Sequence, residues 1–187
     1  MKIIVNIATG FISLATVSAA DTLIDVPHYS RDAFGGWIDS DGDCQNTRHE
    51  LLIARSLRPA ELRTDGCLVL RGSWIDPYSS ELQHQASEVD IDHLVPLKFA
   101  WDHGAWDWAA DKMEQFANDP INLAITHKSL NRSKGPDGPL DWLPPNDEFK
   151  CAYIDNFIEV MQLYSLSLTK YETLLLNELR LTVCNAN

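Results

Sequence analysis

Residues 88–97 constrain the fold of this 187-residue chain more than any other stretch, because they combine a strand pattern with reactive side chains. The stretch begins as a strict alternation of polar and apolar residues, which is typical of a β-strand and places Asp90 and Asp92 on one face. His93 follows directly, and Pro96 then ends the regular pairing. A carboxylate and a titratable imidazole are therefore expected side by side at a strand end.

A second strand and a short helix are expected further along the chain. Residues 118–126 predict a turn that leads into a strand, and residues 127–134 predict about two helical turns. Gly135 and Pro136 end this helix. Two strands and a helix, with an Asp-His pair on the first strand and Asn131 on the helix, form a compact frame for one cation.

The composition indicates a folded domain with an acidic surface. Hydrophobic residues make up 45% of the chain, which excludes a disordered tail, and the length fits one domain with a substantial core. The formal net charge of −12 argues against a nucleic-acid partner, because binding to phosphates depends largely on Lys and Arg. A nucleic-acid function would therefore rely on local positive charge.

The N-terminal residues 1–20 have the layout of a secretory signal peptide. Lys2 gives a positive start, residues 3–17 are mostly apolar, and small residues precede a cleavage site after Ala19 or Ala20. An uncleaved anchor is the alternative, but the apolar run is shorter than the roughly 20 residues that a membrane span needs. We expect export, a single mature domain over residues 21–187, and no membrane attachment after cleavage.

Four cysteines agree with export, because an even set without CxxC spacing is typical of disulfides in secreted proteins. Three connectivities are possible. Pairing Cys44 with Cys67, and Cys151 with Cys184, is favoured because each bridge would close a locally plausible unit. Four free buried thiols are the alternative.

Further elements are expected on both sides of the frame. Thr47 and Glu50 have the spacing of a capping box, which predicts a helix that ends before Pro59. Residues 67–71 and the stretch around Trp74-Ile75 predict two short strands joined by a glycine.

The C-terminal end predicts a helical hairpin. Apolar residues recur at helical spacing over residues 149–161, and a second helix begins at Thr169, where Glu172 completes another capping box. A bridge from Cys151 to Cys184 would join the outer ends of the two helices.

An ordered set of residues carries a family resemblance: Asp92-His93 with Pro96, Asn122-Leu123, and Asn131 followed by Lys134. This set resembles the HNH, or His-Me finger, endonuclease motif in members whose third motif residue is Asn. Further stretches resemble the secreted bacterial branch of that family, and these are Tyr29-Ser-Arg31, Asp41-Gly-Asp-Cys44, Thr47-Arg48, Gly72-Ser-Trp74, Asp76-Pro-Tyr78, Gly104-Ala105, Phe116-Ala-Asn-Asp119 and Trp142-Leu-Pro-Pro145. The resemblance implies an α+β fold with a ββα-metal core, added helices and two disulfides.

The resemblance implies a secreted, metal-dependent endonuclease that hydrolyses DNA with little sequence preference, and the choice between DNA and RNA stays open. His93 would be the general base that activates water. Asp92 and the side-chain oxygen of Asn131 would hold one divalent cation, Mg²⁺ in the first place, with Mn²⁺ and Ca²⁺ as alternatives. Asn122 would pin the hairpin and help to orient His93. We expect the protein to act as a monomer.

Three basic residues are expected to meet the substrate. Lys134 and Arg132 lie where they could bind phosphates or stabilise the transition state, although both could simply be solvated. Arg48 is a further expected substrate contact, because its motif recurs in the resembling family.

Two other functions and one auxiliary site stay open. The protein could be a phosphodiesterase for another extracellular phosphate ester, or a non-catalytic, disulfide-stabilised binding module. Four acidic residues also match positions of a calcium-loop pattern, but the required glycine is absent, so an acidic turn that caps the next helix is the alternative to an auxiliary Ca²⁺. These residues are Asp39, Asp41, Asp43 and Glu50.

Overall fold

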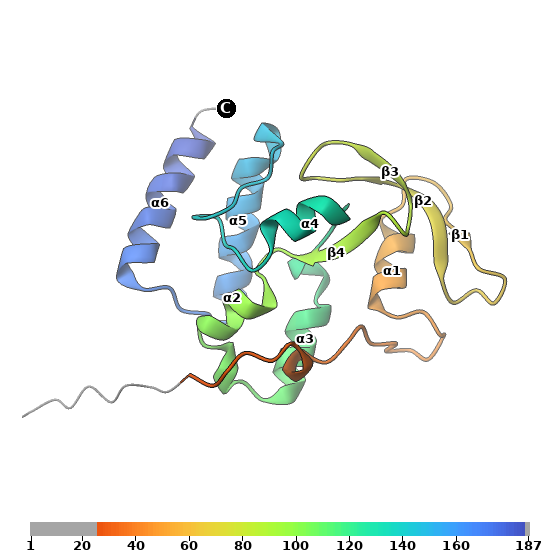
Figure 1. Ribbon diagram of the computed structural model, residues 1–187, viewed down its shortest axis with the longest axis horizontal. Coiled ribbons are helices and arrows are strands. Elements are labelled where there is room, and N and C mark those ends of the chain that lie inside the picture. The colour runs from red at the N-terminus through yellow and green to blue at the C-terminus, as the bar shows by residue number, and fades with distance from the viewer. Residues whose placement is uncertain (1–25, 186–187) are drawn as a thin grey trace, which may run out of the picture.

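A computed structural model describes residues 26–185. The expected signal peptide, residues 1–20, lies outside the described residues. The described chain has an α+β fold with two small antiparallel sheets, of which the three-stranded one lies at one edge of the molecule beside α1 while most helices lie on the other side (Figure 1). Among its helices none has the length and apolar character needed to cross a membrane.

The larger sheet contains three strands in the order β1-β2-β3. These strands are β1 (Glu61–Leu62), β2 (Val69–Ile75) and β3 (Leu82–Gln85). The expectation of two short strands was wrong, because β2 runs unbroken through Gly72. A Cβ at Gly72 would lie 2.3 Å from the Trp74 side chain, so glycine allows the indole to cover the strand where its register shifts.

The smaller sheet and one helix form a ββα unit. Strand β4 (Val89–His93) pairs antiparallel with β5 (Leu123–His127), which places Asp92 opposite Ala124. Helix α4 (Lys128–Lys134) packs against both strands. This arrangement is compatible with the expected ββα core.

The two strands are separated in sequence by an insertion, residues 94–122, which forms α2 (Leu97–Asp102), η2 (Ala105–Asp107), α3 (Ala110–Asn118) and η3 (Pro120–Asn122). A short N-terminal turn, η1 (Arg31–Phe34), lies against α2 and α3. Phe34, Trp101 and Phe116 form the aromatic centre of this packing. The insertion and the N-terminal segment therefore share one hydrophobic cluster.

Helix α1 (Thr47–Ala54) includes Thr47 as its first helical residue, so Thr47 is not its N-cap. Asn46 is the N-cap, and its side chain accepts from the His49 backbone N–H. The Thr47 hydroxyl instead donates to Asn118 over 2.7 Å. The capping-box prediction at Thr47 was wrong, because a long-range partner takes the hydroxyl.

The C-terminal hairpin is confirmed. Helices α5 (Asp147–Leu163) and α6 (Lys170–Cys184) lie side by side (Figure 1), and Thr169 with Glu172 forms the expected capping box. Both favoured disulfides are present, Cys44–Cys67 and Cys151–Cys184. The second bridge links the start of α5 to the end of α6.

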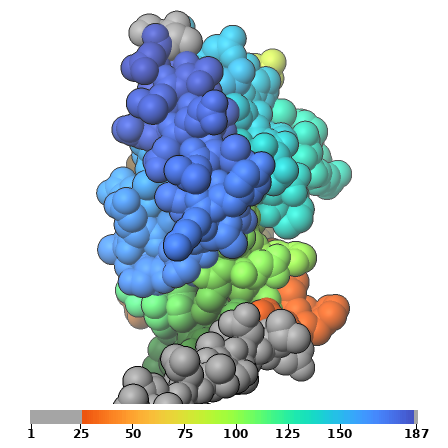
Figure 2. Space-filling view, turned by 90° about the vertical axis from the view of Figure 1, so that its left-hand side faces the viewer, coloured from red at the N-terminus to blue at the C-terminus, as the bar shows by residue number. Residues whose placement is uncertain are grey.

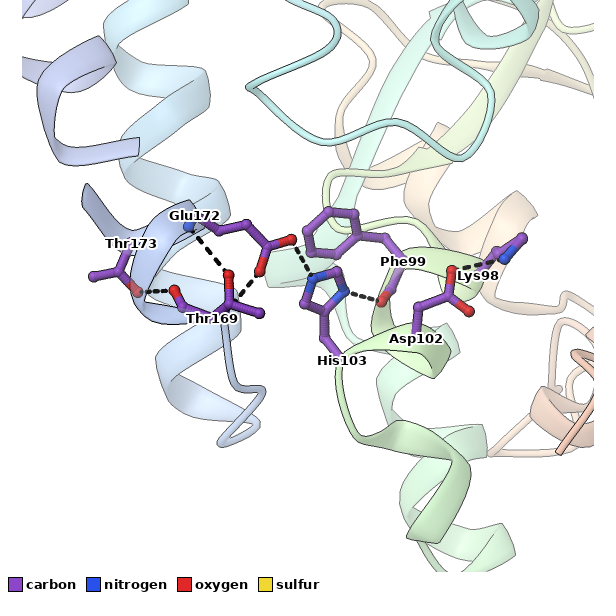
Figure 3. A network of polar contacts seen from close by, with 7 residues as sticks. All are labelled: Lys98, Phe99, Asp102, His103, Thr169, Glu172 and Thr173. Carbon is purple, nitrogen blue, oxygen red and sulfur yellow. Dashed lines mark hydrogen bonds and ion pairs between the residues drawn. The ribbon is translucent and has the colours of Figure 1, made fainter. Parts of the chain in front are cut away.

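A polar network joins the insertion to the hairpin (Figure 3). The His103 ring stacks on Phe99, its Nδ1 lies 2.7 Å from the Phe99 carbonyl, and its Nε2 lies 3.2 Å from Glu172 Oε1. On the same helix, Lys98 pairs with Asp102 across 2.6 Å. The network holds the start of α6 against the end of α2.

Candidate active site

Asp92 is buried in a network of donors at the end of β4. Tyr78 donates its hydroxyl to Asp92 Oδ2 over 2.5 Å. Lys134 donates to both carboxylate oxygens, over 2.8 Å to Oδ2 and 3.0 Å to Oδ1. Asp92 is only 5% exposed, so these hydrogen bonds replace the water that would otherwise solvate its carboxylate.

Lys134 reaches Asp92 from the last turn of α4 and is completely buried. Its ammonium also donates to the His93 carbonyl over 2.6 Å. Burial lowers the pKa of Lys134, and the neighbouring Asp92 opposes that shift. The sequence predicts Lys134 beside a phosphate, whereas in the structure its three donors are directed to the end of β4.

His93 is held between an aromatic ring and a backbone carbonyl. Its imidazole stacks on Trp37, with ring centroids 5.4 Å apart and planes 8° from parallel. Nε2 lies 2.8 Å from the Ala117 carbonyl oxygen. Because a carbonyl oxygen only accepts, Nε2 carries the proton and Nδ1 is left unprotonated in the neutral ring.

The environment keeps His93 neutral. Burial lowers its pKa to about 4; the bond to Ala117 opposes this shift, and the nearby charges of Arg31 and Lys134 add to it. A neutral imidazole at physiological pH is the form that accepts a proton.

Asn122 fixes the chain directly after His93. Its Oδ1 accepts from the Val95 backbone N–H over 2.8 Å, and its Nδ2 donates to the Val95 carbonyl over 3.3 Å. The Asn122 backbone carbonyl accepts from Leu94 over 2.8 Å. Asn122 is fully buried, so these bonds pin the insertion to the end of β4.

Asn131 faces Asp90 from the middle of α4. Its Nδ2 donates to Asp90 Oδ2 over 3.1 Å, which leaves Oδ1 as its free side-chain acceptor. Asp90 was not among the expected site residues, although the alternation of the strand placed it on the same face as Asp92. Asp90 therefore sets which end of the Asn131 amide is available.

A cleft of about 400 Å³ brings these groups together. It is lined by Asp92, His93 and Asn131 from the ββα unit. The other lining residues come from the N-terminal segment, α2 and the turn after α4, and these are Tyr29, Arg31, Ile91, Pro96, Leu97, Lys98, Gly135 and Pro136. The motif residues and the N-terminal residues Tyr29 and Arg31 therefore line the same cleft.

Comparison with known proteins assigns the chain to a family. Residues 52–177 match the sequence profile of GmrSD restriction endonucleases, C-terminal domain. The chain belongs to the GmrSD C-terminal domain family. A fungal protein of Arthroderma benhamiae, described as an uncharacterized secreted protein, is 40% identical over 148 residues, which is 77% of this chain and 70% of the relative. No solved structure matches the chain significantly.

Some residues of the site lie before the region that matches the GmrSD profile in the sequence. Trp37, which stacks on His93, and Arg31, which lines the cleft, both precede residue 52. Neither residue was among the predicted site residues. The stretch Tyr29-Ser-Arg31 within the wider resemblance was the signal that could have identified Arg31.

The two arginines that were predicted to bind substrate, Arg48 and Arg132, do not line this cleft. Arg48 donates to the carbonyls of Ala86 and Val89 over 2.8 and 2.9 Å, so its guanidinium joins α1 to the start of β4. Arg132 is exposed on α4 and is not among the residues that line the cleft. A substrate contact for Arg132 stays a prediction.

The acidic loop before α1 brings three carboxylates together, those of Asp39, Asp41 and Asp43. Asp39 accepts from the backbone N–H groups of Gly42 and Cys44 over 2.8 and 2.9 Å, so it closes the loop itself. The pKa of Glu50 is raised by burial and by the nearby carboxylates of the loop. The loop is therefore an acidic turn closed by its own side chain, but Asn46 caps α1, so the expectation that the acidic turn caps this helix was wrong.

Proposed function

We propose that this protein is a secreted, metal-dependent endonuclease of the HNH type that hydrolyses phosphodiester bonds in DNA, and in RNA as a second substrate. The observation that carries the proposal is the meeting of Asp92, His93 and Asn131 in one cleft on a ββα unit. The match to a domain of restriction endonucleases supports a nucleic-acid substrate.

His93 is the proposed general base. Its Nε2–H is held by Ala117, so Nδ1 takes a proton from the attacking water. The water oxygen bonds to phosphorus as the bond from phosphorus to the 3′ oxygen breaks, and the leaving oxygen is protonated from solvent. The products carry a 5′-phosphate and a 3′-hydroxyl.

The donor set of the cleft fits one hard divalent cation, with Mg²⁺ preferred over Mn²⁺ and Ca²⁺. A carboxylate offers about four lone-pair positions, and Tyr78 and Lys134 use three of those on Asp92, so one remains on Oδ1. Asn131 contributes its free Oδ1. When bound, the cation would supply positive charge that stabilises the negative charge on the phosphate oxygens in the transition state.

Lys134 and Tyr78 act through Asp92. They fix the carboxylate in one orientation, much as outer partners orient metal ligands in other proteins. Lys134 also holds the His93 carbonyl, and Asn122 holds the residues that follow. These contacts hold His93 and Asp92 in fixed positions relative to each other. Lys134 then has a structural role and does not contact the phosphate.

Export and a monomeric state belong to the same proposal. The two disulfides are typical of proteins that leave the cytosol. The relative from Arthroderma benhamiae is described as secreted. An exported nuclease of this kind would degrade nucleic acid outside the cell.

The proposal is tested by offering the purified, disulfide-bonded protein three substrates: supercoiled plasmid DNA, a structured RNA, and bis(p-nitrophenyl) phosphate. We expect nicking and linearisation of plasmid with Mg²⁺ or Mn²⁺, and no cleavage with EDTA. Hydrolysis of the small diester alone would support the phosphodiesterase alternative. Intact nucleic acids under every divalent cation would contradict the nuclease proposal, and inert behaviour toward all three would favour a binding module.

A further inference from the structure

Residues 26–38, here called the N-terminal strap, lie across the insertion. Trp101 Nε1 donates to the Pro27 carbonyl over 2.8 Å, and the Ile38 backbone N–H donates to Asn118 Oδ1 over 3.2 Å. Between these anchors Phe34 is fully buried. Figure 2 shows the start of the strap in orange beside the green surface of the insertion. The strap is thus a fixed wall.

The strap presents Tyr29, Arg31 and Trp37 to the candidate active site. Trp37 stacks on His93, and Tyr29 and Arg31 line the main cleft. Arg31 and His93 also share an adjoining hollow of about 120 Å³. Arg31 and the proposed general base therefore line both hollows together.

Two lysines near Arg31's cleft are already paired: Lys98, which lines the cleft, and Lys134, which is buried against Asp92. Lys98 lies 2.6 Å from Asp102 (Figure 3), and Lys134 lies 2.8 Å from Asp92. Within residues 26–185, Arg31 is exposed and has no carboxylate at ion-pair distance. Its positive charge is therefore available to a ligand.

We propose that Arg31 binds a phosphate of the nucleic-acid backbone in this cleft, beside the bond that is cut. The inference rests on the proposed nuclease function. A guanidinium is planar and can bind two phosphate oxygens at once. On an acidic protein, one arginine without a carboxylate partner can therefore provide a phosphate contact. The strap lies before residue 52, so this subsite lies outside the region that the family profile matches.

The subsite is tested by the salt dependence of oligonucleotide binding in a His93→Ala background with Mg²⁺. Each phosphate contact contributes roughly 0.7–0.9 to the slope of log K against log salt. We expect Arg31→Ala to reduce the slope by about one contact and to weaken binding about tenfold. Arg31→Lys should keep most of the slope. The matched control is Arg58→Ala, at an exposed arginine in the loop after α1 that does not line the cleft.

Cleavage kinetics in the His93-containing protein give a second readout. We expect Arg31→Ala to raise KM more than it lowers kcat, with an unchanged melting temperature. Equal slopes and equal KM for Arg31→Ala and Arg58→Ala, in a protein that still cleaves, would overturn the Arg31 subsite alone. A parent protein that neither binds nor cleaves nucleic acid would overturn the proposed function and the subsite together.

Discussion

Lys134 and Asp92 form a buried ion pair beneath the proposed cation position. Both side chains are removed from water, and each is held by additional hydrogen bonds. Removing one partner of such a pair is strongly destabilising, because the other charge is left buried without compensation. The pair therefore contributes to folding as well as to the geometry of the site.

We predict that Lys134→Met lowers the free energy of unfolding by about 3 kcal/mol or more. Adding Asp92→Asn should recover part of the loss, because the unpaired charge is then gone. Urea denaturation measures both values. Lys170→Met, at an exposed lysine at the start of α6, is the matched control and should change stability by less than about 0.5 kcal/mol. An equally small effect for Lys134→Met would contradict the buried pair.

His93 makes the stability of the protein depend on pH. Its pKa is about 4 in the folded protein and about 6.5 in an unfolded chain. Between these values the unfolded chain binds the proton more tightly, so the contribution is complete above about pH 6.5 and is lost as the pH falls toward 4.

We predict that the difference in unfolding free energy between wild type and His93→Gln shrinks by about 3 kcal/mol from pH 7 to pH 4. Urea melts at several pH values, in EDTA to exclude metal binding, provide the measurement. Comparing the two proteins removes the titration of the carboxylates, which they share. A difference that stays constant across this range would show that the His93 imidazole is not held neutral.

The positions of the site residues could be predicted only where spacing decides them. Asp92, His93, Asn122 and Asn131 were expected from the motif, and the structure brings three of them to one cleft while Asn122 pins the chain behind it. The direction of Lys134 could not be predicted, because packing decides whether a side chain in the last turn of α4 points inward or outward.

The elements of the fold were predicted best where local signals are strong. The capping box at Thr169 and the apolar spacing before it predict the C-terminal hairpin. The N-terminal strap carries no such pattern. Its place at the site depends on contacts between residues far apart in sequence, such as Trp37 with His93, and these are invisible to local periodicity.

The hairpin offers a test at this scale. Cys151 and Cys184 are 33 residues apart, and a loop of that size predicts a loss of about 3–4 kcal/mol when both are replaced by Ser. The reason is the larger entropy of the unfolded chain. We expect cleavage of plasmid DNA to persist at temperatures where the variant is folded, since the bridge lies at the ends of α5 and α6 and does not line the cleft.

Guanidinium unfolding of the double Ser variant measures this loss. The double Ser variant of Cys44 and Cys67, whose loop spans 23 residues, should lose a similar amount and is the natural comparison. Unchanged stability without the Cys151–Cys184 bridge would mean that α6 is held by packing alone.

At the scale of the whole molecule, the charge of −12 limits how the protein can hold nucleic acid. With this excess of acidic residues, nucleic-acid binding would depend on a divalent cation and on a few local groups. The −12 charge therefore predicts weak non-specific binding and rapid release. Both properties suit a nuclease that acts outside the cell with little sequence preference.

The most direct test of the account is the single-turnover rate of plasmid cleavage with Mg²⁺ by wild type, His93→Ala and His84→Ala. His84 lies exposed on β3 and does not line the cleft, so it is the matched control. We predict that His93→Ala loses about 10²–10⁴-fold in rate, as expected for removal of a general base, while His84→Ala cleaves like wild type. Equal rates for all three proteins, each shown to be folded, would contradict the assignment of His93 as the base.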